Sequence, residues 1–221
     1  MSELVVAVNR AELKQQGIEC AGIYPVDLTE LNQQNYALLP RAYADNKTVG
    51  AIGLGAQLPQ ILGYFQIVNH DGRILAYQRK GKEQGLFGKW SIGVGGHVSQ
   101  EDMFSVADNT GESYPDLVDI VFEGACRELE EELGIQVGWI ECLGDIDSFT
   151  EAANTIIATD VDPTSSVHVG LPMQIELPEH VYDSIKLDPA EFCNYQWLTP
   201  QELKMGDREW ETWSDLLIKA M

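Results

Sequence analysis

The hydrophobic pattern of the first 60 residues predicts short elements. The apolar run 4–8 predicts a buried strand, and residues 11–16, which a glycine follows, predict a short helix. A second helical segment is expected over residues 27–39, because a proline comes directly after it. Residues 41–58 contain several glycines but no repeated βα pattern, so they predict a mixed connection rather than a dinucleotide site.

The pattern becomes more regular from residue 61 onward. Residues 63–68 and 73–78 are rich in β-branched and aromatic side chains, and the segment between them ends in Asp71-Gly72, which is a strong hairpin signal. Residues 89–96 predict a strand whose glycines allow another group to approach the backbone closely. This part of the chain therefore predicts neighbouring antiparallel strands.

The second half of the chain predicts one long helix among further strands. We expect this helix over residues 114–133, with Ser113 and Asp116 as a capping box and a glycine after its last turn. The other expected elements are strands over 137–143, 155–159, 167–177 and 192–198, a short helix over 199–203 and a packed amphipathic helix over 207–220. Together these elements indicate the α/β class.

Composition narrows the range of partners. The chain has 221 residues, of which 44% are hydrophobic, enough for one substantial core. Its formal net charge of −21 argues against nonspecific binding to nucleic acid polymers or to anionic membranes. It does not exclude a small phosphorylated substrate, because a bound cation reverses the local charge.

The cysteines and the absence of long apolar runs indicate a cytoplasmic protein. No stretch is apolar for 18 residues, and the first residues contain no basic signal region. The four cysteines show no CxxC spacing, so we expect reduced, mostly buried thiols rather than disulfides or a zinc site. They are Cys20, Cys126, Cys142 and Cys193.

Three glutamates near the end of the long helix are the strongest chemical signal. On a helix, Glu128, Glu131 and Glu132 fall within one arc of about 100°. Like charges this close repel one another unless a cation lies between them, and Mg²⁺ or Mn²⁺ prefers such oxygen ligands. The alternative interpretation is a solvated helix face, which is what a run of glutamates in a helix usually forms.

Residues 127–135, which read R-E-L-E-E-E-L-G-I, stand downstream of the glycine pair Gly95-Gly96. This arrangement resembles the Nudix hydrolases, whose motif is G-x5-E-x7-R-E-U-x-E-E-x-G-U, with U an aliphatic residue, and it fills the second half of that motif. The resemblance implies the Nudix fold, an α/β/α sandwich with a mixed β-sheet, over residues 61–221. We expect residues 1–60 to form an N-terminal extension packed on the same core.

A narrower likeness concerns the glycine-rich strand. Residues 87–97, taken with residues 167–171, are similar to a bacterial branch described as predicted Nudix-type phosphoesterases, whose substrate class is unsettled. This likeness sharpens the expected fold and leaves the ligand open.

The first half of the Nudix motif departs from the family pattern. Gly96 and Arg127 are 31 positions apart, against 14 in the motif, which leaves 17 extra residues. Counting eight positions back from Arg127 reaches an aspartate instead of a glutamate. Four acids are alternatives for the first motif glutamate, and the sequence does not choose among Glu112, Asp116, Asp119 and Glu123.

The resemblance implies hydrolysis of a diphosphate linkage in a nucleoside diphosphate derivative or a similar small molecule. Glu128, Glu131 and Glu132 with the Gly95 carbonyl would bind Mg²⁺ or Mn²⁺. Arg127 would belong to the catalytic group by bracing these carboxylates from between Glu123 and Glu131. The residues expected to face the substrate phosphates are Arg79 and Lys89.

Several roles stay open at this point. The general base is a glutamate of the helix or an acid from a later loop such as Glu151, whereas His97 and His168 are expected to be structural. A first alternative function is a diphosphate isomerase of the same fold, but the cysteine it needs is absent from residues 91–98. A second is a non-catalytic Nudix-like module that binds a ligand or a protein. The oligomeric state is open, a homodimer included.

Overall fold

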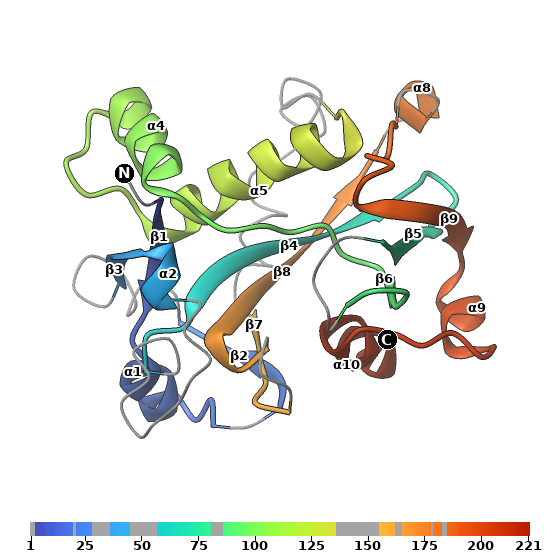
Figure 1. The fold of residues 1–221 in the computed structure, drawn as a ribbon, viewed down its shortest axis with the longest axis horizontal. Coiled ribbons are helices and arrows are strands. Elements are labelled where there is room, and N and C mark those ends of the chain that lie inside the picture. The colour runs from blue at the N-terminus through green and yellow to red at the C-terminus, as the bar shows by residue number, and fades with distance from the viewer. Residues whose placement is uncertain are drawn as a thin grey trace. The chain divides into compact units, whose positions relative to one another are not determined.

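The structure, a computed structural model, contains both strands and helices (Figure 1). It describes residues 3–19, 21–27, 36–44, 57–80, 86–135, 155–161, 165–177, 179–182 and 185–221. The chain forms two compact units that interleave along the sequence. Unit 1 contains residues 1–63, 96–125 and 150–172, and unit 2 contains residues 64–95, 126–149 and 173–221. The expected boundary at residue 60 therefore stays a prediction.

Antiparallel strand pairs form the framework of unit 1. Its strands are β1 (Leu4–Val8), β2 (Gly22–Pro25), β3 (Tyr36–Pro40), β7 (Thr155–Ala158) and the first residues of β4 (Gln60–Val68) and of β8 (His168–Glu176), which the 3-10 helix η2 (Ser165–Val167) precedes. β1 pairs with β3 along its whole length and with β4 at Gln60, while β7 lies between β2 and β8. The strands expected over 4–8, 155–159 and 167–177 are confirmed.

The helix expected over residues 27–39 is wrong in its last part. Residues 36–40 form β3, because their backbone groups pair with β1, from Val8↔Tyr36 to Leu4↔Pro40. Residues 28–35 lie outside the described residues. Two short helices flank these strands, α1 (Arg10–Gln15), which Asn9 caps, and α2 (Arg41–Ala44) in the expected connection.

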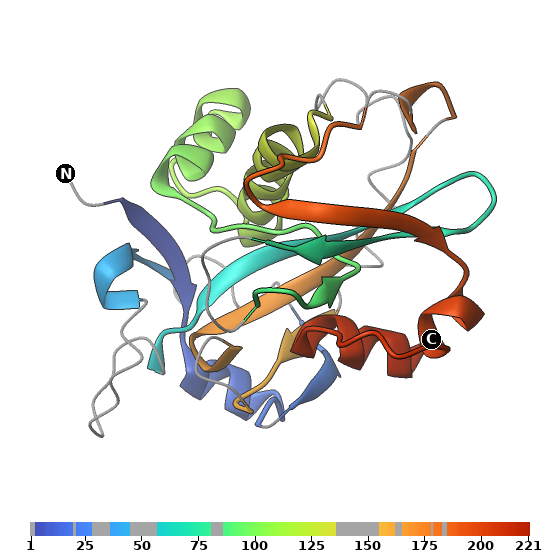
Figure 2. The same ribbon diagram turned by 45° about the vertical axis from the view of Figure 1, so that its right-hand side comes forward.

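Unit 1 contains a helix that the sequence analysis did not predict. This helix, α4 (Gln100–Thr110), begins with a reciprocal capping box between Ser99 and Asp102 and ends at Gly111 in the left-handed conformation. It lies beside the first turns of α5 (Leu117–Leu133) (Figure 2), where Ser105 Oγ donates a hydrogen bond to Glu123 at 2.6 Å. The long helix thus begins three residues later than expected, and the expected Ser113–Asp116 capping box is wrong.

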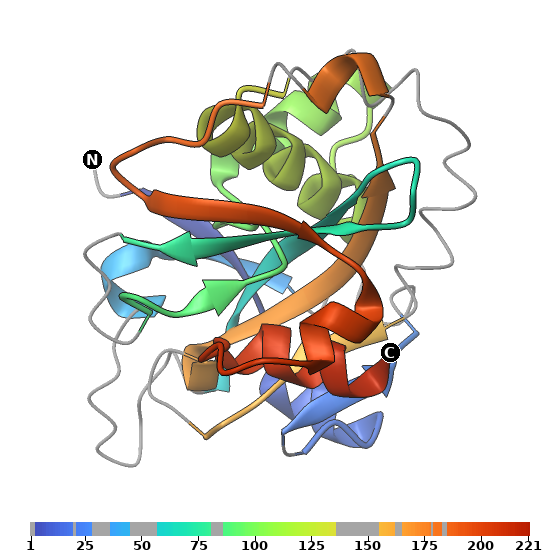
Figure 3. The ribbon, with the colours of Figure 1, turned by 90° about the vertical axis from the view of Figure 1, so that its right-hand side faces the viewer.

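Unit 2 is built on the hairpin that the Asp71-Gly72 signal predicted. The end of β4 pairs with β5 (Ile74–Arg79), and Gly72 has a φ of +71° in the turn between them. β5 also pairs with β6 (Trp90–Ser91) and with β9 (Phe192–Leu198) (Figure 3). The strand expected over residues 89–96 is reduced to β6 and to a bridge between Val94 and Phe65.

Among the described residues, three helices follow in unit 2. They are α8 (Glu179–Tyr182), which was not expected, α9 (Pro200–Lys204) and α10 (Thr212–Ala220). Thr199 caps α9 together with Glu202, and Pro200 occupies the first turn, as the sequence predicts. The last helix is shorter than the expected 207–220. Within the described residues, no helix is both long enough and apolar enough to cross a membrane.

Candidate functional site

The last turns of α5 bury an apolar face in unit 2. Cys126, Leu129 and Leu133 are almost completely buried, so the helix is fixed and its carboxylates project from the other faces. Gly134, with a φ of +67°, ends the helix, and its N–H donates to the Glu130 carbonyl. The acidic segment therefore lies on a well-packed helix, as the pattern of residues 127–135 predicts.

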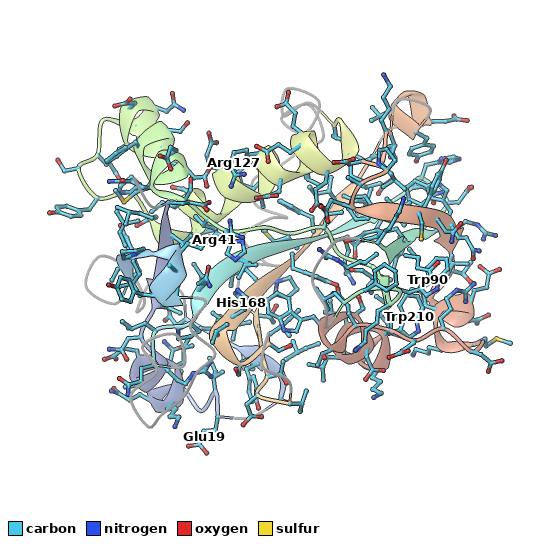
Figure 4. All side chains as sticks on the ribbon, in the orientation of Figure 1. Glu19, Arg41, Trp90, Arg127, His168 and Trp210 are labelled. Atoms are coloured by element: carbon cyan, nitrogen blue, oxygen red, sulfur yellow. The ribbon has the colours of Figure 1, made fainter. Side chains whose placement is uncertain are left out.

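Arg127 connects two of the three glutamates (Figure 4 labels Arg127 on α5). Its Nη1 atom lies 2.9 Å from Glu128 Oε1 and 3.5 Å from Glu131 Oε1. The side chain of Glu128 is only 17% exposed, whereas that of Glu131 is 61% exposed. The i, i+4 spacing predicts the pair with Glu131, and the pair with Glu128 adds a second brace. Arg127 therefore orients Glu128 more firmly than Glu131.

The environment of Glu132 strongly perturbs its carboxyl group. Burial raises the pKa of Glu132 to about 8, Arg79 opposes this shift, and three other carboxylates add to it. They are Glu128, Glu191 and Glu211. The Oε2 atom of Glu132 is buried and has no hydrogen-bond partner among the described residues. A carboxylate in such a place is stabilised by a proton or by a cation.

Glu132 and Glu128 are the residues whose oxygen atoms suit a divalent cation. The unsatisfied oxygen of Glu132 and the nearby Glu128 are hard oxygen donors of the kind that Mg²⁺ and Mn²⁺ prefer. In the part of the chain that the structure describes, however, no three His, Cys, Asp or Glu side chains are grouped closely enough to hold a metal ion. Glu131, paired with Arg127, would have to turn to join them.

The two residues expected to bind phosphate are brought together. The Arg79 N–H donates to the Lys89 carbonyl at 2.9 Å, so the two residues face each other across backbone hydrogen bonds at the end of β5. Arg79 is also close enough to Glu132 to lower its pKa. Lys89 Nζ lies 3.8 Å from Glu209 Oε1. Gly95 follows Val94, which exchanges two backbone hydrogen bonds with Phe65, and the role of its carbonyl stays a prediction.

Sequence analysis missed two acids near Glu132. Glu191 precedes β9 and Glu211 precedes α10, and no local motif marks either residue. Glu211 is buried, and its Oε1 accepts hydrogen bonds from the hydroxyls of Tyr64, Ser91 and Ser214. Only the fold brings these acids to the end of α5.

A third missed acid, Asp102 of unit 1, had a signal in the sequence. It stands six positions after Gly96, where the motif G-x5-E has its first glutamate. Asp102 is buried and accepts hydrogen bonds from the backbone N–H and the hydroxyl of Ser99. In the structure it therefore serves as a helix cap.

The correspondence of one of the four acids to the first motif glutamate stays a prediction with four alternatives. Glu123 accepts a hydrogen bond from Ser105, and burial, with Asp116 and Glu112, raises the pKa of Asp119. These contacts do not choose among the four acids.

Other candidates stay predictions as well. The rings of His97 and His168 meet edge to face in unit 1, with centroids 5.4 Å apart. Glu151 and the strand expected over 137–143 lie outside the described residues. Of the two described cysteines, Cys126 is buried and Cys193 is exposed.

Comparison with known proteins identifies the family. The profile of the NUDIX domain matches residues 62–219, well over half of the chain. A search of curated proteins found no match. Among solved structures, Tm1382, described as a candidate Nudix hydrolase, is 18% identical with a TM-score of 0.65, and the alignment covers 99% of this chain and 100% of that chain.

Two further structures are more distant. The MutT protein from Methanosarcina mazei Go1 is 20% identical, with a TM-score of 0.44, over 73% of this chain and 92% of that chain. DR0079 from Deinococcus radiodurans is 16% identical, with a TM-score of 0.47, over 89% and 96%. The match to the NUDIX domain and the likeness to Tm1382 confirm the resemblance and the expected α/β Nudix fold.

Proposed function

The chain belongs to the NUDIX domain family, and we propose that it hydrolyses a diphosphate linkage in a small molecule, such as a nucleoside diphosphate derivative, with the help of a divalent cation. The observation that supports the proposal is the buried environment of the Glu132 carboxyl group. This glutamate of the family motif is buried near Glu128, and one of its oxygens has no hydrogen-bond partner among the described residues. A buried carboxylate with only a structural role would destabilise the folded protein, because nothing would compensate its charge.

The residues of the site divide into two groups in this proposal. Glu128 and Glu132 would hold Mg²⁺ or Mn²⁺, with Glu131 and the Gly95 carbonyl as further ligands. The bound cation would neutralise charge on the phosphoryl oxygens and lower the pKa of a coordinated water. The second group is Arg79 and Lys89.

Arg79 and Lys89 would contact the diphosphate. Their backbones are joined by a hydrogen bond, so the two residues lie side by side at the end of β5. Arg127 keeps Glu128 oriented through the 2.9 Å ion pair. In the reaction, one water oxygen bonds to phosphorus, the bridging P–O bond breaks, and two phosphorylated products leave.

Substitution of the glutamates tests this proposal. Glu128→Gln and Glu132→Gln are expected to lower Mg²⁺-dependent turnover by about 10²–10³-fold, and Glu131→Gln less, since Glu131 is exposed. Glu130→Gln is the matched control, because Glu130 is exposed on the same helix. Phosphate would be measured after phosphatase coupling, against nucleotide sugars, dinucleoside polyphosphates, ADP-ribose, dinucleotides, nucleoside triphosphates and prenyl diphosphates. Full turnover in both Glu128→Gln and Glu132→Gln would refute the proposal.

A second candidate function is ligand binding without turnover. It is favoured by the ion pairs of Arg127 with Glu128 and Glu131, which occupy two of the expected metal ligands. This function predicts that one of the screened molecules raises the melting temperature while no product forms. Product formation that depends on Mg²⁺ and on Glu132 would exclude it.

A further inference from the structure

A pocket of about 280 Å³ lies in unit 2 beside α9 and α10. We name it the C-terminal pocket. Leu203 and Ile218, both buried, give it an apolar base, and Trp210 forms one wall. None of the residues assigned to the proposed hydrolytic site lines it. The C-terminal pocket is therefore a separate feature of the surface.

The charge of this pocket is opposite to that of the chain. Acidic residues outnumber basic ones by 35 to 14 in the sequence, so an average lining would be acidic. Here the lining contains Lys204, Arg208 and Lys219 against one acid, Asp215. Asp215 Oδ2 lies 2.5 Å from Lys219 Nζ, which leaves Lys204 and Arg208 as excess positive charge. The pocket thus has the electrostatic character of an anion site.

Arg208 is held in place by three contacts. Its guanidinium donates to Gln196 Oε1 at 2.8 Å and to the Met205 carbonyl at 3.4 Å, and it lies over the Trp90 ring, 5.4 Å from the centroid. Trp90 in turn meets Trp210 edge to face at 6.5 Å, and both rings are labelled in Figure 4. The cation and the aromatic wall are thus positioned before any ligand arrives, which lowers the entropy cost of binding.

We propose that the C-terminal pocket binds a small organic anion of the nucleoside monophosphate class, which carries a flat aromatic base. The nucleobase of this ligand packs against Trp210 and the apolar residues of the pocket, and the phosphate of the ligand contacts Arg208 and Lys204. A volume of about 280 Å³ lies at the small end of ligand pockets, which suits a mononucleotide better than a dinucleotide. The choice of ligand rests on the proposed function, because a nucleoside monophosphate is a product expected from it.

The test is a calorimetric titration of the full chain with AMP in EDTA at low ionic strength. EDTA removes divalent cations and so suppresses metal-dependent binding at the proposed hydrolytic site, and the variants of the pocket assign the binding that remains. Hydrolysis is tested separately with Mg²⁺ and the Glu132 variant. Saturable binding is expected, and binding should weaken as salt is added. Adenosine, which lacks the phosphate, should bind about tenfold more weakly than AMP.

Four variants locate the site. Lys204→Gln and Arg208→Gln should each weaken AMP binding by about 3–10-fold, and Lys204 is exposed, so its replacement leaves the fold intact. Asp215→Asn, which removes the acid of the lining, should tighten binding by about 2–5-fold. Lys14→Gln, on exposed α1, is the control of equal charge and should leave binding unchanged.

Three results would overturn the proposal. They are the absence of saturable AMP binding, equal affinity for adenosine and AMP, and unchanged affinity in both Lys204→Gln and Arg208→Gln. If AMP binds in EDTA but no screened diphosphate is hydrolysed with Mg²⁺, the proposed function fails while the pocket stands.

Discussion

Gly93 is expected to tolerate no side chain, not even a methyl group. A Cβ atom at this position would lie 1.9 Å from Cε1, 2.2 Å from Cζ and 2.3 Å from Cδ1 of Tyr64. These are atoms of a rigid ring, and Tyr64 is only 4% exposed. Since non-bonded carbon atoms do not approach one another to such distances, either the ring or the backbone at Gly93 must move in Gly93→Ala.

The Tyr64 ring cannot move without breaking a hydrogen-bond cluster. Its hydroxyl donates to Glu211 and is hydrogen-bonded to Ser214 Oγ at 2.7 Å and to Ser91 Oγ at 3.1 Å. Overpacking costs about 1–3 kcal/mol, and loss of a buried hydrogen bond to a charged group costs about 1.5–3 kcal/mol. We therefore expect Gly93→Ala to lower the free energy of unfolding by about 2.5–6 kcal/mol, a large part of the stability of an ordinary domain.

Urea denaturation followed by circular dichroism measures this change. Gly17→Ala is the control, because Gly17 has a φ of +84° but no atom within 4 Å of a Cβ, so its cost is conformational, about 1–2 kcal/mol. In a Tyr64→Ala background the clash is removed, and Gly93→Ala should then cost less than about 1 kcal/mol. A cost at Gly93 no larger than that at Gly17, or an undiminished cost in the Tyr64→Ala background, would refute the steric reasoning.

Three further predictions concern the metal, a helix cap and the α4–α5 contact. Adding Mg²⁺ at 100 times its Kd should raise the free energy of unfolding by about 2.7 kcal/mol relative to EDTA, measured as a rise in melting temperature that Glu132→Gln abolishes. Hydrogen bonds from Thr199 lower the pKa of Glu202 below its ordinary value of 4.5. The ionised carboxylate therefore stabilises the folded protein at pH values above 4.5, and this contribution is lost as the pH falls through the lowered pKa. The melting temperature of Glu202→Gln should accordingly lie below that of the unsubstituted protein at neutral pH and meet it in strong acid. Gly124→Ala would place a Cβ atom 3.0 Å from Asp102 Oδ2 and should cost about 1–3 kcal/mol in urea denaturation.

Elements defined by adjacent residues could be predicted from the sequence. Asp71-Gly72 fixes a turn through the conformations of two residues, and Thr199-Pro200 fixes a helix start through one side chain and one ring. The Ser99–Asp102 capping box carries the same kind of signal, with Asp in place of Glu. The start of this helix was therefore predictable from local residues, although it was not predicted.

Elements defined by distant partners were harder to predict. Residues 36–40 form β3 because β1, about 30 positions earlier, supplies the matching backbone groups. The propensity of the segment alone does not contain this information. The strand expected over residues 89–96 failed for a related reason, since its glycines serve a close packing contact, that of Gly93 with Tyr64, rather than a continuous strand.

The same division between local and distant information applies to the candidate site. The pair between Arg127 and Glu131 follows from a four-residue spacing on one helix, and it could be predicted. The burial of Glu132 and its proximity to Glu191 and Glu211 depend on where β9 and α10 begin, which no spacing in residues 127–135 encodes. Because a buried carboxylate among other carboxylates destabilises the protein unless a proton or a cation compensates it, the fold itself gives the reason to expect a ligand there. The family motif identifies the residue, and its environment supplies the physical argument for what it binds.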